Sequence, residues 1–154
     1  MTLTTHATVG TLIGYAVGQP FIGFVLGFIS HLLLDMIPHG DYALSQSVRR
    51  TKAQLKKVVT FVSLDAIVAI FFILWLVNWK DLVPIQAITW AIAGAVLPDL
   101  LVGLYDICKT KWLKPFNDLH FYFHDMWVKK RKDIPLRLAL GLQLVLIILL
   151  QTQL

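Results

Sequence analysis

Histidine and aspartate side chains gather at the end of one hydrophobic segment, 24-FVLGFISHLLLDMIPHGDY-42. Within it, His31, Asp35, His39 and Asp41 fall in a stretch of eleven residues. Imidazole and carboxylate are ligands that Zn²⁺, Mn²⁺ and Fe²⁺ accept in proteins. Cys108 is the only cysteine in the chain, so a cluster of thiolate ligands is excluded. The segment therefore predicts a divalent-metal site without sulfur.

Similar side chains recur in other apolar segments, and together they make up the predicted ligand set. Its members are His6, His31, Asp35, His39, Asp65, Asp99, His120 and His124. Close-set metal ions lower the pKa of bound water and stabilise the attacking and leaving oxygens of phosphoester hydrolysis. An aspartate that binds no metal would serve as the base. We therefore expect a metal-dependent hydrolase, with zinc as its metal and manganese or iron as alternatives.

The elements that must position these residues are apolar helices. The chain is 57% hydrophobic, with a mean hydropathy of +0.70, whereas soluble domains are about 45–50% apolar. Four segments, roughly 20–37, 58–78, 84–107 and 134–152, approach the ~20 residues that a membrane-spanning helix needs. A shorter segment, 6–18, precedes them. The sequence predicts an all-α, polytopic membrane bundle of about five helices, with one domain over residues 1–154.

The distribution of basic residues predicts how this bundle is oriented. Lys and Arg concentrate in 49-RRTKAQLKK-57 and in 129-KKRK-132, which the positive-inside rule places in the cytoplasm together with the N-terminus. The segment 116-FNDLHFYFHDMWVKK-130 is typical of an interfacial helix on that side. We expect an integral protein of a bacterial-type inner membrane, in contact with membrane lipids. The basic segments flank spans and give no strong nucleic-acid signal.

Depth along the helices brings the carboxylates together. Glycines recur every four residues in 10–18 and in 23–27, and small faces let membrane helices approach closely. We expect these two faces to pack against each other as a hairpin. At ~1.5 Å per residue, Asp35, Asp65 and Asp99 fall in one layer near the inner membrane boundary. A site in that layer would face a phospholipid or a lipid-linked phosphate as substrate.

Simpler interpretations stand beside the metal hypothesis for the deeper residues. His31 with Asp35 would also suit a polar clamp between helices. Asp65 or Asp99 alone would suit a buried hydrogen bond or a snorkelling side chain.

The outer residues have simpler interpretations too. His6 follows two threonines and would suit a helix N-terminus. The turn 38-PHGD-41 contains His39 and Asp41, and an aromatic interfacial helix often exposes side chains such as His120 and His124. The last span, 134–154, is interpreted as contributing only to helix contacts. Three further acids fit caps or solvated positions: Asp118, Asp125 and Asp133.

Three stretches resemble a known family. The segments 27-GFISHLLLDMIPH-39, 5-THATVG-10 and 94-GAVLPDL-100 resemble the YdjM-like family of inner-membrane proteins. That family is described as metal-dependent hydrolases and as LexA-binding, and is similar to zinc-dependent phospholipase C and P1 nuclease. The resemblance covers roughly residues 5–125. It implies an all-helical bundle with a His/Asp trinuclear zinc site, in which His6, His31, Asp35 and Asp99 are ligands and His120 and His124 match loosely.

Two other functions fit the same residues. A non-catalytic metal-binding or ion-translocating protein would also place aspartates in facing hairpins, and further ligands toward the outer side would favour it. A membrane scaffold would use the basic segment 49–57 to recruit a soluble partner.

Overall fold

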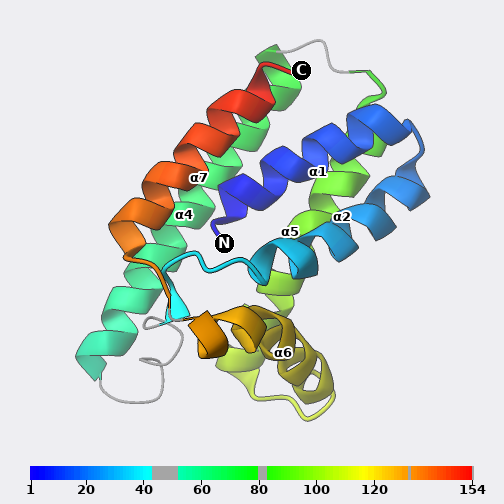
Figure 1. Ribbon diagram of the computed structural model, residues 1–154. Helices are drawn as coiled ribbons and strands as arrows, with labels where there is room; N and C mark the ends of the chain where they lie inside the picture. The colour runs from blue at the N-terminus through cyan, green and yellow to red at the C-terminus, as the bar shows by residue number, and fades with distance from the viewer. Residues whose placement is uncertain (43–51, 80–82, 132, 154) are drawn as a thin grey trace.

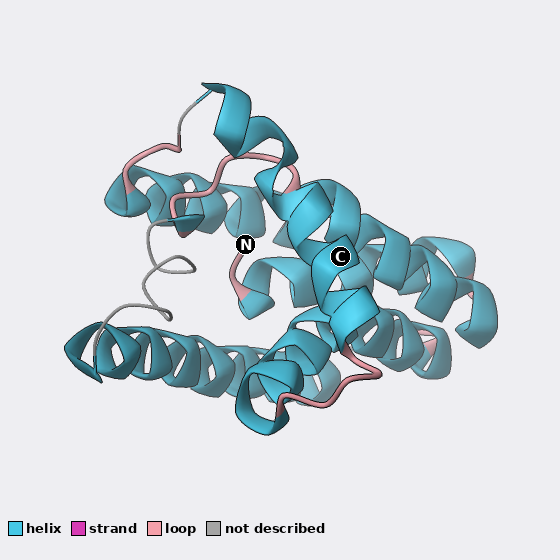
Figure 2. Ribbon diagram, turned by 90° about the horizontal axis from the view of Figure 1, so that it is seen from below, coloured by secondary structure: helices cyan, strands magenta, loops and turns pink. Residues whose placement is uncertain are grey.

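The described part of the chain is helical throughout. The computed structural model describes residues 1–42, 52–79, 83–131 and 133–153 (Figure 1). Within these ranges it contains helices and loops but no strand (Figure 2). The helices are α1 (Leu3–Val17), α2 (Pro20–Asp35), α4 (Lys52–Trp79), α5 (Ile85–Cys108), α6 (Lys114–Arg131) and α7 (Leu136–Gln151). The all-α prediction is confirmed.

Small residues bring α1, α2 and α5 into close contact. A Cβ added at Gly10 would lie 2.9 Å from the Cα of Ile92, and one added at Gly27 would collide with the carbonyl oxygen of Ala91. Ala91 and Ala95 are completely buried. The glycine faces of α1 and α2 therefore both pack on the alanine stripe of α5. This differs from the predicted arrangement, in which the two glycine faces pack on each other.

In the part of the chain that the structure describes, two helices are long and apolar enough to cross a membrane. They are α5 and the part of α4 over Val59–Asn78. Both α2 and α7 have 16 residues, which is about 24 Å at 1.5 Å per residue against ~30 Å of hydrocarbon. Helix α2 ends at Asp35, three residues before Pro38, because the residue before a proline disfavours helical geometry.

Helices α4 and α5 meet at one end and diverge toward the other. Leu76 of α4 is completely buried in a small apolar cluster with Ala7 of α1 and Ile88 of α5. From this contact the two helices separate toward α6 (Figure 1). A cavity of about 310 Å³ lies between them at the open end, lined from both helices. The divergence places this cavity beside the predicted ligands.

The first turn of α1 is held from α7. Thr2 caps α1, since its side chain accepts a hydrogen bond from the Thr5 amide. The side-chain oxygen of Gln143 accepts hydrogen bonds from the Thr2 amide at 2.9 Å and the Thr5 hydroxyl at 3.1 Å. In both views the N-terminus lies at the centre of the molecule (Figures 1 and 2). Helix α7 thus does more than fill space, which differs from the prediction for this span.

Two features used for the orientation prediction fall partly outside the described residues. Positions 49–51 of the basic segment and 132 of the second basic run are among those that the structure does not describe.

Candidate metal centre

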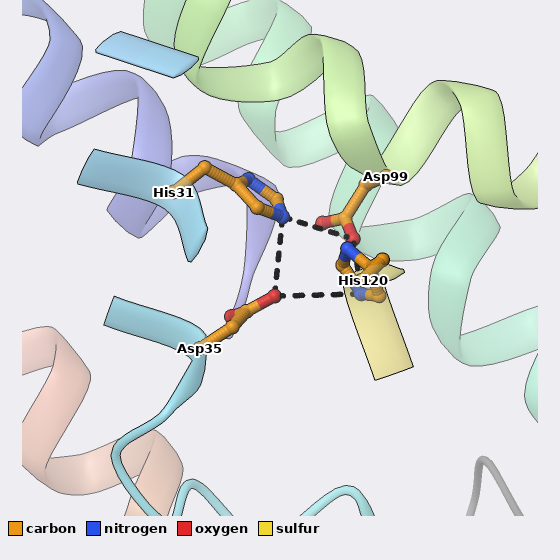
Figure 3. A group of neighbouring side chains, drawn as sticks. All are labelled: His31, Asp35, Asp99 and His120. Carbon is orange, nitrogen blue, oxygen red and sulfur yellow. Dashed lines mark ion pairs between the residues drawn. The ribbon is translucent and has the colours of Figure 1, made fainter. Parts of the chain in front are cut away.

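Four predicted ligands from three helices converge in a first His/Asp group. His31 and Asp35 come from α2, Asp99 from α5 and His120 from α6 (Figure 3). His31 Nε2 lies 3.1 Å from Asp35 Oδ2 and 3.5 Å from Asp99 Oδ1, and His120 Nε2 lies 3.7 Å from Asp35 Oδ2. One ligand atom from each of the four lies within 4.8 Å of every other. This spacing suits a shared metal ion.

A hydrogen bond to the backbone fixes the ring of His31. Its Nδ1–H donates to the carbonyl oxygen of Ala95 at 2.7 Å. In the neutral ring Nε2 then carries a lone pair, and this buried atom has no hydrogen-bond partner among the described residues. Metal-binding histidines almost always donate their second ring N–H to a carbonyl, carboxylate or water in this way. His31 is therefore oriented as a ligand would be.

A second His/Asp group, made of His39, Asp41 and His124, repeats the same construction. Asp41 Oδ1 lies 2.9 Å from His39 Nε2 and 3.0 Å from His124 Nε2. The Nδ1–H of His39 donates to the carbonyl oxygen of Ile37 at 2.7 Å, and that of His124 donates to Asp125 Oδ1 at 3.0 Å. Both rings thus present Nε2 to one carboxylate.

The loop that carries His39 and Asp41 is held in place by Asp133. The two oxygens of Asp133 accept hydrogen bonds from the amides of Gly40 at 2.8 Å and Tyr42 at 3.0 Å. Gly40 has φ +85°, and a Cβ there would lie 2.7 Å from the Cα of Leu136. A side chain at this position would be both strained and crowded. The loop geometry therefore depends on a glycine and on an acid next to α7.

Asp35 connects the two groups. Its Oδ2 faces the first group, while its Oδ1 lies 4.0 Å from His39 Nε2 in the second group and 3.1 Å from His6 Nε2. The His6 ring also stacks on His31 with ring centroids 3.9 Å apart. The Met1 ammonium contacts Asp35 and lies 2.9 Å from His39 Nε2. A carboxylate with one oxygen toward each group is placed to bridge two cations.

The charges of the histidines on α6 differ sharply. Burial lowers the pKa of His120 to about 4, although Asp35 and Asp99 oppose this. Burial acts in the same direction on His124, but the hydrogen bond and charge of Asp41 raise its pKa to about 9. Burial favours protonation of Asp41, yet hydrogen bonds from His124 and His39 hold its pKa well below the usual range. At neutral pH His120 is ready to bind a metal, whereas His124 must first lose a proton.

Asp65 lies outside both groups. Its Oδ2 accepts a hydrogen bond from the Leu3 amide at 2.7 Å, and its Oδ1 accepts one from the Thr4 hydroxyl at 3.3 Å. It therefore satisfies a backbone N–H that the first turn of α1 leaves unpaired. In the structure the half-buried Asp65 makes these hydrogen bonds, and it also lines the wall of the cavity.

The structure brings most of the other predicted ligands together. His6 lies outside the two groups but contacts Asp35. Six predicted ligands belong to the groups: His31, Asp35, His39, Asp99, His120 and His124. The predicted ligand set did not include Asp41, because its position in the turn 38-PHGD-41 offered a simpler interpretation. It also missed Asp125, which is 5% exposed rather than solvated. The only sequence signal for Asp125 is its position directly after His124.

These side chains fit a divalent ion such as zinc, manganese or iron, because they combine imidazole nitrogens and carboxylates without sulfur. Three buried imidazole nitrogens, on His6, His31 and His120, have no hydrogen-bond partner among the described residues. Comparisons with protein-family models, curated proteins and solved structures found no match to this chain. The chemistry of the centre is therefore inferred from its side chains alone.

Proposed function

We propose that this protein is a membrane-bound, metal-dependent hydrolase that cleaves a phosphoester of a lipid or a lipid-linked substrate. One observation carries the proposal. His31, His39 and His124 are each anchored through Nδ1 to an oxygen and each turn Nε2 toward an aspartate. A neutral imidazole nitrogen and a carboxylate both present lone pairs, so each contact needs a ring proton or a metal ion between the two atoms, and three such pairs close together favour metal ions.

Each group would hold one ion, with Asp35 between them. Bound there, the ions would supply activation of water and charge stabilisation for the phosphoryl oxygens. The backbone carbonyls of Ala95 and Ile37 keep two histidine rings in the ligating orientation. Asp65 and Asp106 line the cavity outside both groups, and Asp65 already accepts two hydrogen bonds. Asp106 accepts a hydrogen bond at its Oδ1 from the exposed Lys109, at 2.7 Å, so its Oδ2 is our candidate for the proton acceptor.

A membrane location is supported by the surface as well as by the two long helices. Large apolar side chains are exposed along α4 and α7, among them Phe71 on α4 and Leu149 on α7. Contiguous apolar surface of this kind marks contact with a membrane or a partner. We propose the predicted polytopic bundle, with the metal centre on the cytoplasmic side. The exposed Trp112 and Trp127 near and on α6 suit the headgroup level there.

The ion-translocation alternative is less well supported. Its path would need polar ligands toward the outer end of the core. In the described segments 7–17, 20–30 and 85–98, none of the side chains carries an imidazole or a carboxylate. The carboxylates and imidazoles of this core instead gather at one end. The YdjM-like resemblance would assign the same residues, His31, Asp35 and Asp99, to a metal-dependent hydrolase.

The proposal is tested first by metal content. The detergent-purified protein would be analysed by elemental mass spectrometry beside a His31→Ala, Asp35→Ala double variant. An Asp118→Asn variant, whose side chain is exposed on α6, serves as the control. We expect at least one zinc, manganese or iron ion per chain in the wild type and the control, and about one ion fewer per chain in the double variant. The metal-loaded protein should then release phosphate or a headgroup from phosphatidic acid or phosphatidylglycerol vesicles. Absence of metal in every sample, even after reconstitution with added ions, would contradict the proposal.

A further inference from the structure

The cavity beside the metal centre has two chemically different ends. One end is lined by both His/Asp groups, through Asp35, Asp99 and His120 of the first and Asp41 and His124 of the second. The remainder is lined mainly by apolar side chains of α4, α5 and α6. These are Phe61, Val62 and Ala66 of α4, Leu100 and Val102 of α5, and Phe121 of α6. Two carboxylates, Asp65 and Asp106, also line it outside the two groups. A ligand that fills the cavity must therefore be polar at one end and mostly hydrocarbon along the rest.

The apolar part of the cavity opens sideways between the two helices that are long enough to cross a membrane. Val62 of α4 and Leu100 of α5 both line it, and they are 52% and 57% exposed. Leu76 of α4 and Ile88 of α5 belong to one buried cluster, and the two helices lie further apart toward α6 (Figure 1), so the opening is a slot between their walls. If both helices cross the bilayer, this slot faces acyl chains rather than water.

We infer that the slot between α4 and α5 holds a hydrocarbon chain of the substrate, which reaches the metal centre laterally from the bilayer. This rests on the proposed function for the identity of the polar end. The substrate class it selects is a phosphoester with a long hydrocarbon chain, such as a phosphatidic acid. A headgroup phosphoester without a chain would reach the metals but leave the slot empty.

Gly103 provides a precise way to close the slot without disturbing the fold. It lines the cavity, and a Cβ placed on it would meet nothing within 4 Å. Gly141 on α7 has the same open surroundings, and the cavity lining does not include it. Both are exposed glycines inside a helix, so replacing either by leucine raises helix propensity alike. Gly103→Leu fills the slot, and Gly141→Leu is its matched control.

The position of the chain can be measured independently of hydrolysis. Zinc-loaded protein would be mixed with phosphatidic acid that carries a diazirine on one acyl chain, in phosphatidylcholine vesicles. After illumination, labelled peptides would be mapped by mass spectrometry. We expect labels on the cavity-facing parts of α4 and α5, reduced about tenfold in Gly103→Leu and unchanged in Gly141→Leu. Labels spread over α2 and α7, with no effect of Gly103→Leu, would overturn the inference.

Hydrolysis then separates this inference from the proposed function. Gly103→Leu should lower the rate on phosphatidic acid about tenfold relative to para-nitrophenyl phosphate, while Gly141→Leu changes neither. If Gly103→Leu hydrolyses both phosphoesters at the wild-type rates, the inference about the slot is overturned and the proposed hydrolase function stands. If Gly103→Leu reduces the labelling but the protein hydrolyses neither phosphoester with zinc, manganese or iron, the slot is supported and the proposed hydrolase function is overturned. Matching melting temperatures for the two variants establish that both are folded.

Discussion

His31 on α2 donates its Nδ1–H to the backbone carbonyl of Ala95 on α5, at 2.7 Å. Both residues are completely buried. The bond joins the two most closely packed helices at the level of the first His/Asp group. It also decides which imidazole nitrogen faces Asp35 and Asp99. One side chain thus links the helix contact to the ligand geometry.

The two roles of His31 can be separated by substitution. Asparagine places an amide N–H near the position of Nδ1 but has no group at Nε2, so His31→Asn should keep the bond to Ala95 and lose the ligand. His31→Leu should lose both, and the loss of one buried hydrogen bond costs about 0.5–1.5 kcal/mol. We expect both variants to lose metal, while only His31→Leu shows a lower melting temperature. Metal retention in His31→Asn would contradict a ligand role for Nε2.

Asp125 should act on metal binding through His124. Its Oδ1 accepts the Nδ1–H of that ring at 3.0 Å, and loss of such a partner typically weakens metal affinity about 10–100-fold. Asp125→Ala should therefore weaken zinc binding at the second group, measured against a competing chelator. Lys129→Ala removes the exposed ion-pair partner of the same carboxylate and should change the affinity little. Equal effects of both variants would mean that Asp125 contributes only charge.

Gly27 should be intolerant of a single methyl group. The added Cβ would collide with the carbonyl oxygen of Ala91, so Gly27→Ala must push α2 away from α5. Overpacking of this kind costs about 1–3 kcal/mol. We expect a lower melting temperature in detergent and weaker metal binding, because His31 moves with α2. Gly141→Ala, whose new Cβ meets nothing, should melt at or above the wild-type temperature.

Zinc binding to the second His/Asp group should strengthen with pH. The pKa of His124 is raised to about 9, so a metal must displace its proton at neutral pH. Each pH unit below about 9 should then change the apparent affinity roughly tenfold. His120, with its pKa lowered to about 4, releases no proton in this range. Titrations of an Asp99→Asn variant at pH 6.5, 7.5 and 8.5 isolate the second group. A flat profile would show that His124 is not a ligand.

The helical elements and most members of the two His/Asp groups were predictable from the sequence, because spacing and apolar length are local properties. The partner of each glycine face was not. Spacing of four shows which residues share a face, but it does not say which helix covers that face. The stripe Ala87, Ala91 and Ala95 on α5 has the same spacing and was the missing signal.

Depth also could not distinguish a ligand from a cap. Asp65 and Asp99 were predicted at similar depths, and both line the cavity. Asp99 faces His31, whereas Asp65 on α4 faces the first turn of α1. The direction of a side chain depends on how α4 is rotated about its axis relative to its neighbours. The number of residues from the turn gives only the depth and not this rotation. The second group was harder still, since Asp133 holds its loop from a distance of more than ninety residues in sequence.

The ligands of both groups come from α2, the loop after it, α5 and α6, whereas α4 supplies one wall of the slot. In the proposed hydrolase, the residues that would bind metal and the residues that would hold the substrate chain thus lie on different helices. Substitutions along α4 can change which chain length fits without disturbing the ions, and natural selection can explore them at little risk to catalysis. A set of diverged descendants would be expected to vary most along the slot side of this helix while keeping one chemistry.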